Sequence, residues 1–449
     1  MDAVILSRIQ FAVTVMFHYL FPMITIGMGL FLVFLVGRGL KTGDIRYDRA
    51  AKFWTKIFAL NFVMGVVSGI VMVFQFGTNW AGYSRYVGDV FGSILASEAI
   101  FAFFLESFFL GLLVFGWDKV SPKVHFFATL MVFVGSMISA LWIIVAISWQ
   151  QTPAGFVLRD VEIPGGIVQR AELTDFWAVV FNPSAMDRLV HVLLGAFIVG
   201  AFFILSVSAY YLLKDRHVDF ARRSFVAALI VAAVASLAIA VSGDSHARIV
   251  AEYQPAKLAA MEGVYKTEDG GTAFHLFGIP DSEAKEVRLA VRIPKMLSFL
   301  THRDLNKPVD GLDKFEPDIP PVALPFFGFH FMIWIGCYFI ALTLFALWLL
   351  WRKTLFQTRW ILRIFVFSVP IPFIANNAGW VAAEVGRQPW IVYNLLRTSA
   401  AVSPTVTAAQ VGGSLVMFGL IYILLFAAWI FLLTGIIGKG PEEIGENIQ

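Results

Sequence analysis

Long apolar segments constrain the fold of this chain more than any other feature. Charged residues make up only 14 % of its 449 residues, against about 25 % in an average soluble domain. Nine stretches are apolar over the roughly 20 residues that a helix needs to cross a bilayer. They lie at residues 11–36, 53–76, 91–116, 124–148, 188–213, 221–242, 326–350, 360–383 and 410–436. The sequence therefore predicts an all-α integral membrane protein with nine transmembrane helices.

Basic residues are distributed unevenly between the two ends of these spans. They gather after the first, third, fifth and seventh spans, for example at Arg38, Lys119, Arg222 and Arg352. The alternate connections have fewer basic residues or mix them with acids. Because Lys and Arg favour the cytoplasmic side of a membrane protein, we expect the N-terminus outside and the C-terminus in the cytoplasm.

One connection differs from the rest. Residues 243–323 are rich in charged residues and contain four prolines in their last part, which predicts a solvated outer domain between the helices of 1–242 and those of 324–449. Lys257 and Glu262 are five residues apart there, out of register for a helical ion pair. An exposed run of charges is the simpler interpretation, and a binding role is the alternative.

Four spans carry a possible iron ligand near their outer ends, namely His18, His191, Met332 and Glu384. A single histidine on an apolar face is more often a hydrogen-bonded core residue, and a methionine usually fills a gap. Two histidines, a methionine and a carboxylate in one layer favour haem ligation. Histidine plus methionine would give an electron-transfer haem, whereas a lone ligand leaves one face of the iron open to oxygen.

The eighth span ends in a stretch, residues 379–390, that combines charge with aromatic rings. Glu384 and Arg387 are three residues apart, and Trp380 and Trp390 flank them. An acid and a fixed cation at the edge of the membrane indicate a functional site. The structural alternative is an interfacial cap with a snorkelling arginine and aromatic anchors.

The third span carries two acids, Glu98 and Glu106, and the fourth carries Ser139. Eight residues of α-helix place the two acids about 12 Å apart along the axis. Buried acids that step inward in this way are what a proton relay from the cytoplasm requires. Structural pairing with neighbouring helices is the alternative.

The sequence resembles subunit I of cytochrome bd-type quinol oxidases over essentially its whole length. The resemblance rests on five motifs, of which the last is the most specific. They are Leu-Ser-Arg-Ile-Gln-Phe (6–11) with His18, Gly-Ser-x-x-Ser-Ala-Leu-Trp (135–142), Gln-Thr-Pro-x-Gly (151–155), Lys-Leu-Ala-Ala-x-Glu (257–262) and Gly-Trp-x-x-Ala-Glu-x-Gly-Arg-Gln-Pro-Trp (379–390).

This resemblance implies three haems near the outer surface. It implies a low-spin haem b on His191 and Met332. His18 and Glu384 would serve a high-spin haem b and a haem d, or a third haem b, with the assignment between the two ligands left open. Trp380 would conduct electrons between haems, and Arg387 is placed to hold a haem propionate.

The resemblance also implies the reaction. Quinol would be oxidised at the outer segment by Lys257 and Glu262, and dioxygen would be reduced to water with cytoplasmic protons passing Glu106, Glu98 and Ser139, without pumping. The expected partners are a membrane subunit II, quinol, dioxygen and the lipid bilayer, with small single-helix subunits as further candidates and no nucleic acid. The expected location is the cytoplasmic (inner) membrane of a bacterium or archaeon.

Three departures from the family pattern and two rival functions accompany this prediction. The outer segment is short, His330 stands where many members carry arginine, and Ile147 replaces a common asparagine. A proton-coupled secondary transporter could also use intramembrane acids, although the chain has no internal repeat of the kind such transporters show. A membrane cytochrome b without oxygen chemistry is the other alternative. Cys337 is the only cysteine, which excludes an intrachain disulfide and a Cys-ligated iron–sulfur cluster.

Overall fold

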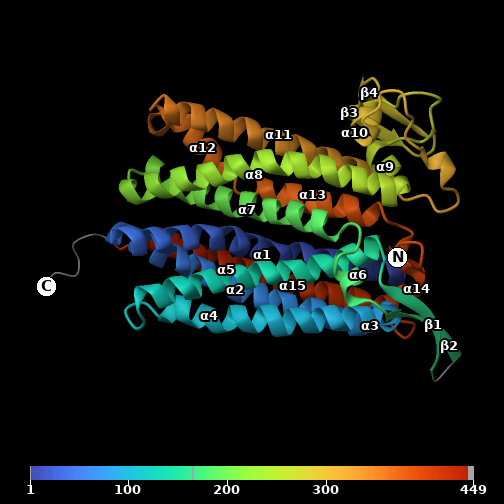
Figure 1. Ribbon diagram of the computed structural model, residues 1–449, viewed down its shortest axis with the longest axis horizontal. Coiled ribbons are helices and arrows are strands. Elements are labelled where there is room, and N and C mark those ends of the chain that lie inside the picture. Colours follow the sequence, from blue (N-terminus) through green and yellow to red (C-terminus); the bar gives the residue numbers. More distant parts are fainter. Residues whose placement is uncertain (1, 164–165, 443–449) are drawn as a thin grey trace.

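The computed structural model describes residues 2–163 and 166–442 as a bundle of long helices that run side by side (Figure 1). Within these residues eight helices are long and apolar enough to cross a membrane, and a bent pair would make a ninth. Every predicted span falls within one of these helices or the bent pair, except that the third extends one residue past Phe115. The predicted all-α membrane fold is therefore confirmed.

The helices are longer than the apolar segments that predict them. Their bounds are α1 (Ala3–Thr42), α2 (Ile45–Thr78), α3 (Ala81–Glu98), the π-helix η1 (Ala99–Phe103), α4 (Phe104–Phe115), α5 (Pro122–Gln151), α6 (Phe176–Val180), α7 (Ala185–Leu213), α8 (Val218–Tyr253), α9 (Pro255–Glu262), α10 (Met296–His302), the 3₁₀ turn η2 (Leu312–Lys314), α11 (Ala323–Trp351), the 3₁₀ turn η3 (Leu355–Gln357), α12 (Arg359–Phe367), α13 (Ile371–Val385), α14 (Thr398–Ala401) and α15 (Ala408–Lys439).

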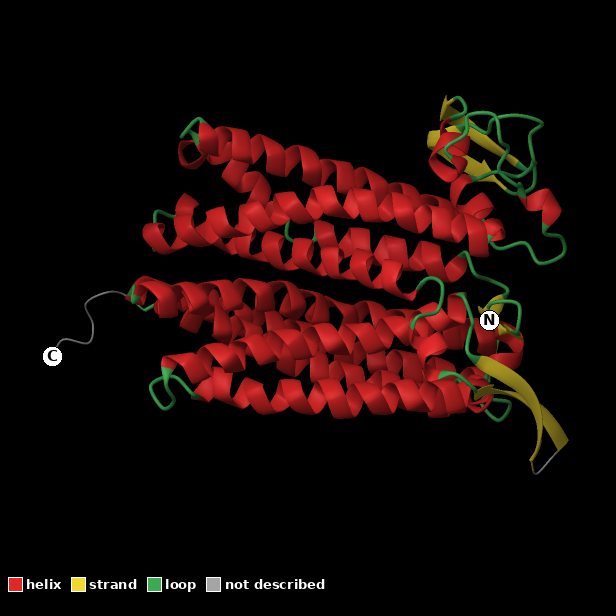
Figure 2. Cartoon of the chain, in the orientation of Figure 1, coloured by secondary structure: helices red, strands yellow, loops and turns green. Residues whose placement is uncertain are grey.

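Three antiparallel hairpins lie at one end of the bundle, the end at which α1 begins (Figure 2). They are β1 (Phe156–Ile163) with β2 (Gly166–Leu173), β3 (Phe274–Asp281) with β4 (Glu286–Ile293), and β5 (Trp390–Val392) with β6 (Leu396–Arg397). We call this end of the bundle, which carries the three hairpins, the hairpin end. The last helix, α15, ends at the opposite end of the bundle (Figure 1).

The centre of the bundle depends on a close approach of α1 and α7. A Cβ atom added at Gly27 would lie 2.3 Å from the backbone oxygen of Ala196, and one added at Gly200 would lie 2.5 Å from the backbone of Gly27. Small residues let transmembrane helices approach this closely. These two helices are also the most buried of the candidate spans, each with 67 % of its apolar window inside the molecule.

The eighth predicted span is broken. α12 and α13 meet at a bend of 41°, and Pro370 and Pro372 lie at the start of α13. Proline lacks the N–H that an interior helical position donates and collides with the preceding turn. Hydropathy alone predicts one continuous helix here, because proline at two positions barely lowers the apolar average.

The segment after the sixth span is structured from its first residues. α8 continues to Tyr253, beyond the boundary predicted at 242. The rest forms a small unit with its own apolar core, which joins α9, β3, β4 and α10 to the first turns of α11. Its buried members include Leu258, Val264, Phe274, Val287, Leu297 and Phe326.

Candidate functional site

The site at the hairpin end begins with an ion pair on the last turn of α13. Arg387 Nη2 donates to Glu384 Oε2 at 2.5 Å, and the arginine side chain is only 4 % exposed. Arg387 also donates through Nε to the backbone oxygen of Trp390 at 3.3 Å. The helix ends at Val385, so Arg387 turns back over Glu384 instead of extending to the surface.

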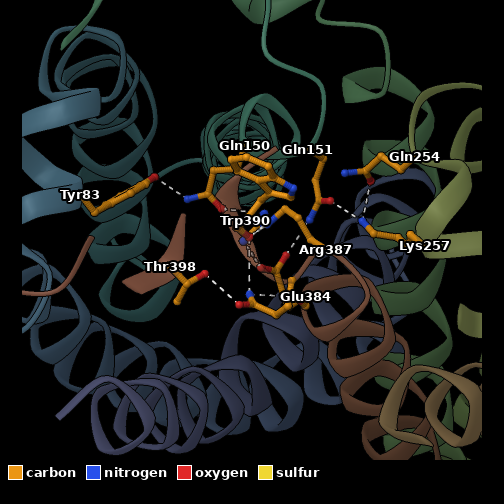
Figure 3. Close-up of polar contacts among 10 residues, drawn as sticks. Tyr83, Gln150, Gln151, Gln254, Lys257, Glu384, Arg387, Trp390 and Thr398 are labelled. Atoms are coloured by element: carbon orange, nitrogen blue, oxygen red, sulfur yellow. Dashed lines mark hydrogen bonds and ion pairs between the residues drawn. The ribbon is translucent and has the colours of Figure 1, made fainter. Parts of the chain in front are cut away.

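Two consecutive glutamines at the end of α5 hold this ion pair (Figure 3). Gln151 Nε2 donates to Glu384 Oε1 at 2.9 Å, and Gln150 Oε1 accepts from Arg387 Nη1 at 3.1 Å. Gln150 also donates to the hydroxyl of Tyr83 on α3. The network therefore fixes α13 to α5 and α3, and its amides are residues to which the sequence assigned no role.

Lys257 joins the same network from α9. Its Nζ donates to Gln254 Oε1 at 2.5 Å and to Gln151 Oε1, and the residue is only 1 % exposed. Burial, followed by the nearby cations Arg188 and Arg387, holds the pKa of Lys257 well below its usual range, while Glu384 acts in the opposite direction. Both hydrogen-bond acceptors described for Lys257 are amide oxygens.

Glu262 closes α9 and is also buried, with 2 % exposure. Its Oε2 has no hydrogen-bond partner among the described residues, and burial raises the pKa of Glu262 to about 8. The prediction that Lys257 and Glu262 lie on a solvated loop is wrong. The physical reason is that α9 packs into the small apolar core, so its two charged side chains enter the molecule.

His18 on α1 contacts polar groups of α2. Its Nδ1 lies 3.0 Å from Ser68 Oγ on α2, and the single hydroxyl proton of Ser68 is donated to the backbone oxygen of Met64 at 2.7 Å. The tautomer with the proton on Nδ1 would leave the Nε2 lone pair for an iron. The ring lies against Gly69, where an added Cβ would approach it to 3.0 Å.

His191 on α7 has a different environment. Its Nδ1 is buried without a hydrogen-bond partner among the described residues. Its ring stacks on His246 of α8, with centroids 5.8 Å apart, and His246 Nδ1 donates to Asp187 Oδ2 at 2.8 Å. His246 was not predicted as a partner of His191, because it lies 55 residues away on the next long helix.

Met332 on α11 lies against α13. A Cβ added at Gly379 would be 2.5 Å from the Met332 sulfur, and the half-buried Trp380 is the next residue. His330 is directed elsewhere: its Nδ1 lies 2.8 Å from the oxygen of Phe326 and its Nε2 lies 2.6 Å from the oxygen of His275. His330 is therefore occupied by backbone carbonyls.

These donors fit haem better than a bare metal ion. No group of three or more His, Cys, Asp or Glu side chains within the described ranges is arranged to hold a metal ion. Haem requires only one or two protein ligands for each iron. His191, with its unpartnered Nδ1, and His18, as a single imidazole beside Ser68, match that demand.

The two acids of the third predicted span each bond a serine of α5. Ser139 Oγ donates to Glu98 Oε1 at 2.8 Å, and Ser136 Oγ donates to Glu106 Oε1. Between the acids lies η1, and single π-helical turns often mark functional sites. Both acids therefore face α5, in which Ser136 is a partner that the sequence reading missed although it lies in the quoted serine motif.

The comparisons with known proteins agree with this geometry. The family model described as "Cytochrome bd terminal oxidase subunit I" matches residues 6–441. The chain belongs to this family. It is therefore a membrane-spanning subunit of a cytochrome bd-type terminal oxidase, an oxidoreductase of electron transport, and the family implies haem cofactors and a second subunit. This membership confirms the predicted family and enzyme class and excludes the transporter alternative.

Individual relatives cover nearly the whole cytochrome bd subunit. The chain is 39 % identical to "Cytochrome bd ubiquinol oxidase subunit 1" of Bacillus subtilis (strain 168), over 99 % of this chain and 95 % of that protein. It is 35 % identical to "Cytochrome bd-II ubiquinol oxidase subunit 1" of Escherichia coli (strain K12), over 99 % and 98 %. The solved bd oxidase from Geobacillus thermodenitrificans matches with a TM-score of 0.88 at 31 % identity, over 98 % of this chain and 99 % of that one.

Proposed function

We propose that this chain carries the haems of a quinol oxidase, oxidises quinol at the hairpin end, and reduces dioxygen to water with protons drawn from the opposite side of the membrane, without pumping. One observation carries the proposal: Lys257 and Glu262 are buried at the hairpin end, and Lys257 is joined through Gln151 to Glu384. The substrate-binding segment and a candidate iron ligand thus share one network.

The haem ligands would be the four residues that the family resemblance implies. His191 and Met332 would hold a low-spin haem b, while His18 and Glu384 would serve a high-spin haem b and a haem d or third haem b. Arg387 would hold a propionate and Trp380 would lie between haems. When bound, these groups would carry electrons from quinol and reduce dioxygen.

Lys257 and Glu262 would bind quinol through opposite properties. Lys257 donates hydrogen bonds to oxygen acceptors, so it can orient a quinol oxygen. Glu262 has an unpartnered oxygen and a raised pKa, so its ionised form is a stronger base than an ordinary carboxylate and can accept a quinol proton. Burial of both side chains keeps water from competing for these contacts.

Proton supply would use the acid–serine pairs of α3, α4 and α5. Glu106 with Ser136 would receive a proton first and Glu98 with Ser139 would pass it towards the hairpin end, which we take as the outer side from the distribution of basic residues. The complex would include a membrane subunit II, with small single-helix subunits as further candidates. It would lie in the cytoplasmic membrane of a bacterium or archaeon.

The test is a reduced-minus-oxidised visible spectrum of the purified complex, combined with haem extraction and carbon monoxide binding. We expect a low-spin haem b band, bands from two high-spin haems and a carbon monoxide complex. A preparation without haem bands would contradict the proposal altogether. Haem bands without carbon monoxide binding would instead indicate a cytochrome b that only passes electrons.

A further inference from the structure

Gln151 connects Lys257, the proposed quinol-binding residue, to Glu384, the proposed haem ligand. It is the last residue of α5 and is completely buried. Its Oε1 accepts a hydrogen bond from Lys257 Nζ, and its Nε2 donates to Glu384 Oε1 at 2.9 Å (Figure 3). Within the described part of the chain, it is the only side chain that hydrogen-bonds both residues.

The orientation of this amide is fixed by its charged partners. An amide has acceptors only on its oxygen and donors only on its nitrogen. If the amide were reversed, its NH₂ group would face the lysine ammonium and its oxygen would face the carboxylate. Each partner thus holds the amide in the orientation that the other requires.

Few other groups could replace this contact. The other amide acceptor of Lys257 is Gln254, and the cations Arg188 and Arg387 lie near enough to lower the pKa of the lysine. Loss of Gln151 would leave a buried ammonium with a single described acceptor. At the other end, Glu384 would keep Arg387 on Oε2 and lose the donor on Oε1.

We infer that Gln151 is a positioning residue that couples binding at the quinol site to the orientation of the Glu384 carboxylate. A quinol or quinone oxygen that draws Lys257 Nζ away from Gln151 releases the amide, and Glu384 then loses a fixed donor. Coupling of this kind is reciprocal, so the state of Glu384 also changes affinity for the quinone. The inference rests on the proposed roles of Lys257 and Glu384.

The adjacent Gln150 provides a matched control. It is also an amide at the end of α5, and it bonds Arg387 and Tyr83. Neither of its described side-chain bonds reaches Lys257 or Glu384. Replacing Gln150 therefore disturbs the same network without cutting the connection between the two sites.

The experiment titrates the oxidised holoenzyme with menadione and with a short-chain ubiquinone while recording the visible spectrum of the high-spin haems, and measures kcat and KM for the reduced forms. We expect a saturable spectral shift in the unaltered enzyme. Gln151→Met should keep its haems, lose the shift and lower KM by about tenfold, because quinol no longer has to displace a hydrogen bond to a charged group. Gln150→Met should keep the shift, because it leaves both hydrogen bonds of Gln151 in place.

A second variant protects the test against misfolding. Gln151→Glu gives Lys257 a charged acceptor that quinol must displace and places a like charge beside Glu384, so it should raise KM and lose the shift. The inference is overturned if the unaltered enzyme shows no shift, if Gln151→Met keeps it, or if Gln150→Met abolishes it equally. Missing haem bands or missing quinol oxidation in the unaltered enzyme would instead contradict the proposed function.

Discussion

At the scale of single residues, burial changes what an ordinary charged side chain can do. Glu262 and Lys257 belong to a segment rich in charges, yet both lie inside the molecule. The buried carboxyl group holds its proton at neutral pH, and the buried amine is surrounded by amides. A site built this way responds to pH in a range that exposed carboxylates do not cover.

The pKa of Glu262 predicts a pH dependence of quinol oxidation. With a pKa raised to about 8, the carboxyl group is mostly protonated at pH 7 and ionises as the pH rises through about 8. If the ionised form accepts the quinol proton, kcat/KM should rise over that range. Glu262→Gln should remove the rise and keep all haems.

The control for this measurement is Glu268→Gln, which changes an exposed acid of the same segment and should leave the profile unaltered. A Glu262→Gln enzyme with the original pH profile would exclude this carboxyl group as the proton acceptor.

The contact between Gly379 and Met332 predicts that a substitution at Gly379 affects the low-spin haem. Gly379→Ala would place a Cβ atom 2.5 Å from the Met332 sulfur and should displace this sulfur, which would then no longer reach the haem iron that it would hold. We expect partial conversion of the low-spin spectrum to a high-spin one, as in Met332→Leu or His191→Ala, with loss of quinol oxidation.

Gly336→Ala is the matched control, because it lies on the same helix as Met332 and an added Cβ meets nothing within 4 Å. A normal low-spin spectrum in both Gly379→Ala and Met332→Leu would end the assignment of Met332 as a ligand.

At the scale of helices, the π-helix between Glu98 and Glu106 brings both acids to α5. The two serines that bond them, Ser136 and Ser139, are three residues apart and so share one face of that helix. A proton path along α5 would then require the acids of α3 and α4 and the hydroxyl groups of α5.

Glu106→Gln should slow oxygen reduction more than it lowers haem content. The amide keeps the shape of the carboxyl group but cannot exchange a proton, so we expect a loss of roughly tenfold or more in turnover. The measurement is electron transfer from the pre-reduced enzyme to dioxygen, with proton uptake recorded in parallel.

Ser136→Ala removes the partner and keeps the acid, so its effect should be smaller. Wild-type proton uptake in Glu106→Gln would remove this residue from the path, whereas loss of haem without a change in turnover per haem would favour the structural role.

The contact between α1 and α7 predicts a stability effect. Gly200→Ala would press a Cβ atom to 2.5 Å from the backbone of Gly27, and overpacking of this kind costs about 1–3 kcal/mol. We expect a Tm several degrees lower in detergent. Gly419→Ala, on α15 with open space around it, should show little change, and an equal loss in both variants would contradict this view of the helix contact.

At the scale of the whole molecule, hydropathy predicts the helix bundle but does not predict the bend between α12 and α13 or the burial of α9. Nine apolar segments predict the helices because each must satisfy its backbone inside a lipid bilayer. The bend between α12 and α13 and the burial of α9 depend on local proline chemistry and on tertiary packing, which an apolar average does not contain.

The candidate site was predictable in its charged members and not in its amides. Glu384, Arg387 and Lys257 are conspicuous because charge is rare in this chain. Gln151 lay in a quoted motif without a role, since its partners Lys257 and Glu384 are 106 and 233 residues away in the sequence. Only the folded chain brings those three side chains together.

The least buried helices show where the molecule meets its surroundings. Only 11 % of the apolar window of α15 is inside the molecule, and 17 % of that of Ala81–Phe115. Exposed side chains on them include Phe104, Phe108, Leu424 and Phe431. Lipid or the second subunit would cover these faces, whereas α1 and α7 form the interior.

The gathering of the hairpins, α9 and the Glu384 network at one end has an electrical consequence. On the proposed function, donor and acceptor of electrons lie on the same side, so electrons move along the plane of the membrane and cross little of its voltage. Protons taken from the other side cross most of it, at about 2.3 kcal/mol for each charge per 100 mV. An opposing membrane voltage should therefore slow the refilling of Glu106 and leave the first electron transfer from quinol almost unchanged.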